Sequence, residues 1–398
     1  MEFHLPENVM FILNTLESAG YAADIVGGSV RDLLLGKSPD DYDITTSATP
    51  DKIKEIFADY RTVDTGIKHG TVSLILDKSQ YEITTYRIDG EYKDSRHPEE
   101  VFFTKRIEED LARRDFTVNA MAYSPLRGLT DPFGGVEDLN RKIIRAVGDA
   151  PTRFVEDALR ILRGIRFSSV LGFEIDEDTS LAIHNKAPLL KNVSVERIFV
   201  ELKKMLLADH AYKLIYEYSY VLLTVIPSLE RICLPDETAY SNADFLSRIT
   251  SMFYLSSKEP NRAFVAFCRD LHTDSALRDD GYAILSSLGR YKLTDVVSVT
   301  HLLHDLGEDR ARKLVDLEIT LGREKKEVIS YLDALISAKV CYRIADLKIG
   351  GDDLISLGVR GKKIGETIEY LLNCVIENQI ANDRGELLAL AKKYIARN

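Results

Sequence analysis

A pair of glycines between a short apolar segment and a short predicted helix constrains this chain more than any other feature. An apolar dipeptide precedes Gly27-Gly28, and residues 29–35 then have the pattern of a helix that Gly36 ends. Glycines have no Cβ, so the chain can turn tightly and bring backbone N–H groups close to a ligand. The N-terminus of the helix, with Arg31 in its first turn, favours an anion. The pattern therefore predicts a phosphate-binding loop.

Two aspartates follow at the spacing of a strand. Asp41 and Asp43 lie in residues 41–45, whose aromatic and β-branched content is typical of a strand. Side chains two apart on a strand point to the same face, so we expect both carboxylates to project together. Carboxylates that close repel unless a cation separates them, and Mg²⁺ prefers carboxylate and phosphate oxygens. On spacing alone, an acidic turn after a helix would be the better interpretation.

The glycine pair and the acid pair together resemble a family signature. Gly-Gly-Ser-x-Arg-Asp at residues 27–32, followed by the two aspartates, resembles class II tRNA nucleotidyltransferases and bacterial poly(A) polymerases, within the polymerase-β-like nucleotidyltransferases. The resemblance implies that Asp41 and Asp43 are the catalytic carboxylates that bind Mg²⁺. It also implies that Gly28 and Arg31 hold the incoming nucleoside triphosphate.

Length and composition are those of a globular protein with more than one domain. The chain has 398 residues, of which 45% are hydrophobic and 29% charged. We expect no membrane partner and a cytoplasmic location, because no apolar run approaches membrane-spanning length and the first residues lack a signal-peptide pattern. The four cysteines are scattered and show no metal-ligand spacing, so we expect reduced thiols. A net charge of −11 argues against coating nucleic acid by bulk attraction, although it leaves room for a local basic track.

Residues 113–120, Arg-Arg-Asp-Phe-Thr-Val-Asn-Ala, also resemble a family motif. The resemblance implies that Arg114 contacts the nucleotide and that Asp115 and Asn119 organise the site or the ribose. From the residues alone, the apolar members could be packing residues and the charged ones a solvent-facing cluster.

Three further features surround these motifs. Residues 89–101 are polar and aperiodic, as in a mobile loop, which in the family is needed to add the terminal A. Residues 131–139 contain a second glycine pair, which we interpret as a hinge after the catalytic domain. Glu82 alternates with apolar neighbours, so a third carboxylate facing the aspartates and a solvated strand position are equally good interpretations.

Residues 156–167 predict a helix with an apolar side and a polar stripe, and they contain the family motif Glu-Asp-x-x-Arg. The stripe consists of four residues spaced three apart: Asp157, Arg160, Arg163 and Arg166. Periodicity alone favours an ordinary salt-bridged face. The resemblance implies instead that Asp157 and Arg160 read the base, while Arg163 and Arg166 hold phosphates or the primer backbone.

The chemistry of that implied pair fits selection of C and A. An aspartate can accept from the amino group of cytosine or adenine, and a neighbouring arginine can donate to the adjacent ring acceptor. Uracil and guanine present a carbonyl oxygen at the same position, which would leave the carboxylate repelled and unpaired.

Two later segments also resemble family motifs. Residues 194–206 predict a structural helix behind the base-reading one, with Arg197 and Glu201 as an internal pair. Residues 349–365 contain closely spaced glycines and a basic run that offer amides and cations to phosphates. A grip on the tRNA elbow and a plain glycine-rich turn between helices are equal alternatives there.

The resemblance implies an α/β nucleotidyltransferase head with a small mixed sheet, followed by an all-α neck, body and tail. We expect the head at residues 1–148, the neck at 149–207, the body at 208–345 and a tRNA-binding tail at 346–398. The implied reaction is template-independent addition of C, C and A from CTP and ATP to the tRNA 3′ end, with release of pyrophosphate. Association into a homodimer is left open.

Alternatives of two kinds remain. Within the family they are an A-adding enzyme, a CC-adding enzyme, or a poly(A) polymerase, which the lack of a long basic extension disfavours. Outside it, a catalytically silent RNA-binding protein is disfavoured, because a pure binder needs no pair of mutually repelling acids. A metal phosphohydrolase centred on His304-Asp305 would need a further histidine and aspartate, for which His272 and Asp309 are poor candidates.

Overall fold

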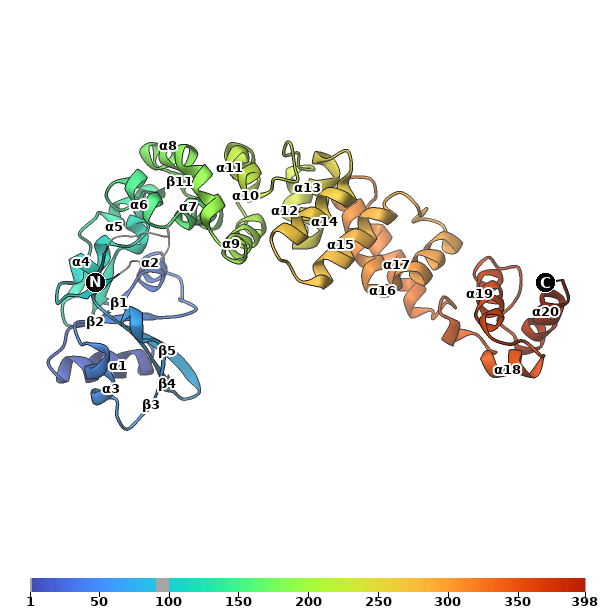
Figure 1. Cartoon of the computed structure of the whole chain (residues 1–398), viewed down its shortest axis with the longest axis horizontal. Helices are drawn as coiled ribbons and strands as arrows, with labels where there is room; N and C mark the ends of the chain where they lie inside the picture. Colours follow the sequence, from blue (N-terminus) through green and yellow to red (C-terminus); the bar gives the residue numbers. More distant parts are fainter. Residues whose placement is uncertain (1, 91–99, 398) are drawn as a thin grey trace. The chain divides into compact units, whose positions relative to one another are not determined.

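The computed structural model describes residues 2–90 and 100–397, and it divides into two compact units, Met1–Ile226 and Pro227–Asn398. The first unit contains the strands and the helices up to α11, and the second is helical (Figure 1). Residues 91–99 of the predicted loop lie outside the described residues. Across the described ranges, no helix combines the length and apolar character needed to cross a membrane.

A mixed sheet forms the core of the first unit, which confirms the predicted fold class. The strand order is β3-β4-β5-β2-β1-β8-β9. Its strands are β1 (Ala23–Val26), β2 (Asp43–Thr46), β3 (Arg61–Gly66), β4 (Thr71–Leu76), β5 (Ser79–Thr85), β8 (Ala122–Ser124) and β9 (Gly128–Thr130). The β2–β5 pair is parallel and the other pairs are antiparallel. Two small ribbons accompany it: β6 (Arg87–Asp89) with β7 (Val101–Phe103), and β10 (Ile143–Ile144) with β11 (Glu174–Ile175).

Local sequence explains how the central strands are connected. Gly27 ends β1 with a φ of +74°, which suits glycine, and α2 (Gly28–Leu34) begins at the next residue. The β4–β5 hairpin turns at Asp77 and Lys78, whose φ angles of +47° and +68° match a two-residue turn. From the sequence, the β-rich residues 70–76 and 81–87, separated by residues 77–80, predict a hairpin at this place. The structure confirms the hairpin, with a turn shorter than those four residues.

Helices surround the sheet and continue beyond it. Those of the first unit are α1 (Glu7–Ser18), α2, α3 (Pro50–Ile56), α4 (Ile107–Ala112), α5 (Gly135–Arg141), α6 (Ala150–Glu156), α7 (Leu159–Leu171), α8 (Glu177–Lys186), α9 (Val195–Leu207), α10 (Ala211–Glu217) and α11 (Ser219–Val225). Helix α9 packs along α7, as expected for residues 194–206. The second unit contains α12 (Glu237–Ser241), α13 (Phe245–Ser256), α14 (Pro260–Asp270), α15 (Ser275–Ser287), α16 (Val296–Thr320), α17 (Glu327–Ser337), α18 (Gly351–Ser356), α19 (Lys362–Ile376) and α20 (Arg384–Arg397).

The expected continuous helix over residues 156–167 is wrong, because the chain breaks between α6 and α7. Asp157 has extended backbone angles, φ −139° and ψ 102°. Its carboxylate accepts from the Leu159 N–H at 3.1 Å, a side-chain to backbone bond that competes with helix continuation. Asp157 therefore lies at a corner before α7 rather than on the helical stripe.

Residues 131–139 form a capped helix start. The Asp131 carboxylate accepts from the N–H groups of Gly135 at 2.7 Å and Val136 at 2.9 Å. A Cβ on Gly135 would lie 2.3 Å from the carbonyl oxygen of Thr117, so only glycine fits this contact. The hinge suggested for this segment stays a prediction.

Asp115 ties the chain before the short 3₁₀ turn η2 (Thr117–Asn119) to helix α7. Its carboxylate accepts from Arg163 Nε at 2.8 Å and Nη2 at 2.6 Å, and from the Asn119 amide at 3.3 Å. Burial by itself would raise the pKa of Asp115. The charge and hydrogen bond of Arg163, the charge of Arg160 and the Asn119 amide outweigh it and lower the pKa to about 2.

This carboxylate makes a pH-dependent contribution to stability. Its pKa falls from 3.8 to about 2 on folding, which corresponds to about 2 kcal/mol at neutral pH. Because the folded pKa is the lower one, the contribution is complete above pH of about 4 and is lost as the pH falls toward 2. We expect Asp115→Asn to lower the free energy of unfolding by about 2 kcal/mol at pH 7, with the gap to wild type narrowing below pH of about 4.

Urea unfolding between pH 7 and pH 3 measures this difference. Asp178→Asn, an exposed carboxylate in the first turn of α8, is the matched control and should leave the free energy of unfolding within about 0.5 kcal/mol of wild type. A gap between Asp115→Asn and wild type that stays constant over this pH range would contradict the assignment.

Candidate active site

Residues from α2, from β2 and from the chain after α4 lie against the glycine loop. A Cβ on Gly27 would lie 2.9 Å from Arg114 Nη1 and 3.9 Å from Asp43 Oδ2. A Cβ on Gly28 would lie 3.5 Å from Arg31 Nη2. The loop thus places a strand carboxylate and two guanidinium groups against backbone that carries no side chain.

Only one of the two predicted aspartates belongs to the strand. Asp43 is the first residue of β2, whereas Asp41 precedes it, so strand alternation does not govern Asp41. Both residues are exposed, and they are close enough to interact. Partial desolvation raises the pKa of Asp43, the positive charge of Arg114 opposes this rise, and the negative charge of Asp41 adds to it. Two neighbouring carboxylates with this repulsion suit a divalent cation.

A polar cavity of about 230 Å³ lies beside Asp43. Its charged lining consists of Asp43, Glu82, Arg87, Arg113 and Arg114. The parallel register of β2 and β5, which aligns Ile44 with Ile83, places Glu82 next to Asp43. Of the two sequence interpretations of Glu82, the one that faces it toward the aspartates agrees with this position.

The donor set at Asp41 and Asp43 fits a hard cation completed by substrate oxygens. Within residues 2–90 and 100–397, no group of three His, Cys, Asp or Glu side chains is arranged to hold a metal ion. Mg²⁺ is commonly bound by one or two carboxylates together with phosphate oxygens. The two aspartates therefore match that mode rather than a cage made only of protein ligands.

Arg31 and Arg114 are each held in place by neighbouring side chains. Arg31 donates through Nη1 to Asn119 Oδ1 at 2.8 Å and through Nε to Asp32 Oδ1 at 2.9 Å. Arg114 lies 3.4 Å from the buried Asp110 carboxylate, and burial lowers its pKa. Its Nε is buried and has no hydrogen-bond partner in the described part of the chain, so one buried donor of Arg114 is unsatisfied.

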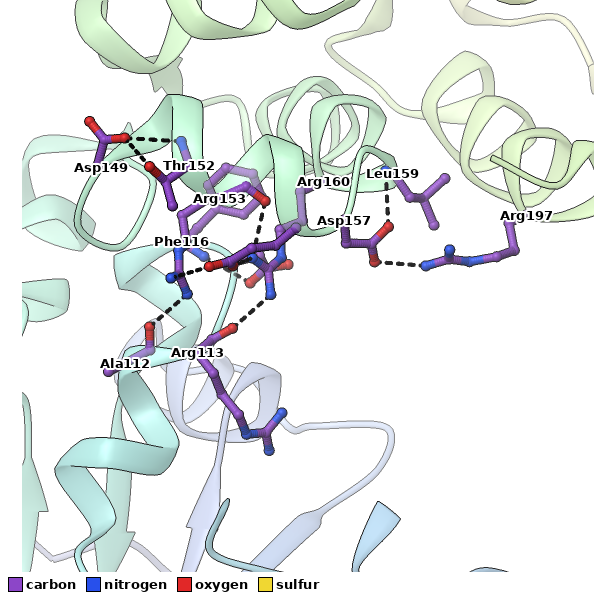
Figure 2. A network of polar contacts seen from close by, with 12 residues as sticks. Ala112, Arg113, Phe116, Asp149, Thr152, Arg153, Asp157, Leu159, Arg160 and Arg197 are labelled. Carbon is purple, nitrogen blue, oxygen red and sulfur yellow. Dashed lines mark hydrogen bonds and ion pairs between the residues drawn. The ribbon is translucent and has the colours of Figure 1, made fainter. Parts of the chain in front are cut away.

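The two predicted base-reading residues lie at the start of α7 (Figure 2). Three of the five N–H donors of Arg160 are engaged, by Glu156 Oε2 at 2.7 Å and by the carbonyl oxygens of Arg153 at 3.1 Å and Arg113 at 2.7 Å. Asp157 accepts from Leu159 through one oxygen and from Arg197 Nη2 through the other, at 2.8 Å. Both side chains are fixed by the protein before any nucleotide is bound.

The expected internal pair of Arg197 and Glu201 is wrong. Arg197 pairs with Asp157, and Glu201 lies 2.5 Å from Arg166 and 3.9 Å from Arg163. A spacing of four residues along a helix permits an ion pair. Because α7 packs against α9, however, Arg197 and Glu201 each find a partner of opposite charge outside their own helix.

Phe167, for which the sequence predicted no role, lies beside three of the predicted arginines. The guanidinium carbons of Arg166, Arg163 and Arg31 lie 3.9, 5.2 and 5.5 Å from the centre of its ring. Cations are attracted to the face of an aromatic ring at such distances. The ring thus brings Arg31 of the glycine loop together with Arg163 and Arg166, which were expected to hold phosphates. The sequence around Phe167 contains no signal of this role.

His304 and Asp305 of the second unit do not form a metal centre. The two ring nitrogens of His304 contact the Tyr342 carbonyl oxygen at 2.9 Å and Glu369 Oε1 at 2.7 Å. Asp305 accepts from the Tyr291 hydroxyl at 2.5 Å. Each side chain therefore has its own protein partners within the second unit.

Known protein families and individual proteins resemble this chain over most of its length. Residues 23–145 match the family described as "Poly A polymerase head domain", and residues 172–230 match "Probable RNA and SrmB-binding site of polymerase A". A CCA-adding enzyme of Enterococcus faecalis is 37% identical over 393 residues, covering 96% of this chain and 94% of that protein. One of Lactobacillus helveticus is 36% identical over 382 residues, covering 94% and 93%.

A solved structure is similar over the whole length. The Bacillus stearothermophilus CCA-adding enzyme in complex with CTP has a TM-score of 0.82 and 30% identity, and the match covers 99% of each chain. The similarity therefore includes the helices that follow the head and is not limited to the catalytic motifs. The chain therefore belongs to the family of CCA-adding enzymes, which are tRNA nucleotidyltransferases.

Proposed function

We propose that this chain adds C, C and A to the 3′ end of tRNA from CTP and ATP, without a nucleic-acid template and with release of pyrophosphate. The observation that carries the proposal is the arrangement of Asp43, Arg114 and the glycine loop in the same unit as the fixed pair Asp157 and Arg160. Full-length relatives named CCA-adding enzymes support it. The proposal implies tRNA, CTP and ATP as partners and a cytoplasmic location.

In this proposal Asp41 and Asp43 hold Mg²⁺, which when bound would supply Lewis-acid activation of the primer hydroxyl and stabilise the leaving pyrophosphate. Gly28 would present its backbone to the triphosphate beside the Arg31 guanidinium, 3.5 Å from the position of a Cβ. Arg31 and Arg114, which lines the cavity beside Asp43, would donate to its oxygens. No side-chain nucleophile is needed, since positioning and charge compensation supply most of the catalysis.

Asp157 and Arg160, at the start of α7, would select the base. Asp157 accepts from the amino group of cytosine or adenine, and a remaining donor of Arg160 reaches the adjacent ring nitrogen. Uracil or guanine would place a carbonyl oxygen against a carboxylate that cannot turn away. Arg163 and Arg166, gathered around Phe167, would hold phosphates of the nucleotide or primer.

Incorporation of each labelled nucleoside triphosphate into three RNAs tests the function. The RNAs are tRNA ending before CCA, tRNA ending in CC, and an unrelated RNA. We expect two C and one A on the first, one A on the second and none on the third. A alone on the CC-ended tRNA would indicate an A-adding enzyme, C alone a CC-adding enzyme, and long A tails on any RNA a poly(A) polymerase; no incorporation would contradict the proposal.

Removal of one carboxylate tests the metal assignment. Asp43→Asn should lower kcat by roughly 10³-fold or more, because a charged ligand to the metal is lost. Asp40→Asn, which removes an exposed neighbouring acid, is the matched control and should keep nearly full activity. Equal loss in both variants, or full activity of Asp43→Asn across a Mg²⁺ titration, would contradict the assignment.

A further inference from the structure

Arg197 of α9 contacts the carboxylate that is proposed to read the base. Its Nη2 donates to Asp157 Oδ2 at 2.8 Å, while Asp157 Oδ1 accepts from the Leu159 N–H at 3.1 Å (Figure 2). The two contacts engage different oxygens of the same carboxylate and come from different helices, α9 and α7. Neither spacing nor composition assigned Arg197 to Asp157.

Two donors on two oxygens fix a carboxylate more strongly than one. A hydrogen bond to Oδ1 alone allows the group to turn about its χ2 torsion, which is broad for aspartate. The second donor stops that rotation. An ionised carboxylate has about four lone-pair sites, so two remain for an incoming amino group.

We infer that Arg197 is a positioning residue for nucleotide selection. It holds the Asp157 carboxylate in the orientation that accepts from the amino group of cytosine or adenine and repels the carbonyl oxygen of uracil or guanine. Without Arg197, the carboxylate can rotate away from that carbonyl oxygen, so the wrong nucleotides are rejected less strongly. The inference rests on the proposed function, because it assigns base reading to Asp157.

A purely structural role for this ion pair fits the surroundings less well. The Arg197 side chain is 24% exposed and that of Asp157 is 18% exposed, so water can reach the Asp157 carboxylate when Arg197 is lost. The packing of α9 on α7 has other sources: the Arg166–Glu201 ion pair at 2.5 Å and the buried side chains of Ile198, Leu202 and Met205. Loss of Arg197 should therefore leave both helices in place.

Nucleotide discrimination by Arg197→Gln tests the inference. The ratio of kcat/KM for CTP over UTP is measured on tRNA ending before CCA, and the ratio for ATP over GTP on tRNA ending in CC. We expect both ratios to fall by about tenfold, the scale of one good base contact. Arg197→Lys, which keeps the charge but not the planar fork, should recover part of the loss.

Controls separate selection from stability. Lys204→Gln removes an exposed positive charge from the same helix and should leave both ratios unchanged. Arg197→Gln in an Asp157→Ala background should cause no further fall in either ratio, because the two residues act through one contact. Calorimetric binding of CTP and UTP without tRNA should show the same loss of preference for CTP at an unchanged Tm.

Other results would contradict the role of Arg197 in nucleotide selection. If Arg197→Gln lowers kcat/KM for all four nucleotides by the same factor, or changes nothing, the inference is wrong. Should Arg197→Gln fail to fold, Arg197→Lys decides, and ratios equal to those of wild type would contradict the inference. Failure of the proposed function itself is distinguishable, because wild type would then add no CCA.

Discussion

Compensation of clustered arginine charge is the constraint on which the site depends. Arg31, Arg114, Arg163 and Arg166 converge on one region of the first unit, and without counter-charges they would repel one another before any phosphate arrives. Carboxylates from neighbouring segments supply those charges: Asp32, Asp110, Asp115 and Glu201. The acidic balance of the whole chain, −11, is therefore compatible with a local cationic site for triphosphate and RNA.

The same ion pairs prepare the site for nucleotides. Arg160 is held by one carboxylate and two carbonyl oxygens, and Asp157 by one backbone N–H and Arg197. Groups held in this way lose little freedom when substrate binds, so discrimination between bases is not reduced by their reorientation. A protein that selects nucleotides without a template needs this rigidity, because its side chains take the place of a complementary base.

Much of the fold and of the glycine loop could be predicted from the sequence, because these features depend on local patterns. The glycine loop, the β4–β5 hairpin, the mixed sheet and the separation of a strand-containing part from a helical part follow from short patterns and from the family resemblance. Partner choice could not be predicted: Arg197 is four residues from Glu201 but pairs with Asp157, because α7 packs against α9. The break at Asp157 and the place of Asp41 outside β2 depend on single side-chain and turn contacts that periodicity does not register. The exact domain boundaries, the homodimer and the tRNA grip of the tail stay predictions.

The central claim is that side chains of this chain, fixed before substrate binds, hold and select the nucleotide. A crystal structure of the full chain with CTP and Mg²⁺ tests it most directly. We expect the metal between Asp41, Asp43 and the triphosphate, and the cytosine amino group on Asp157. The Asp157–Arg197 and Asp115–Arg163 pairs should be unchanged from the free protein. A nucleotide bound elsewhere, or a base edge that contacts neither Asp157 nor Arg160, would contradict it.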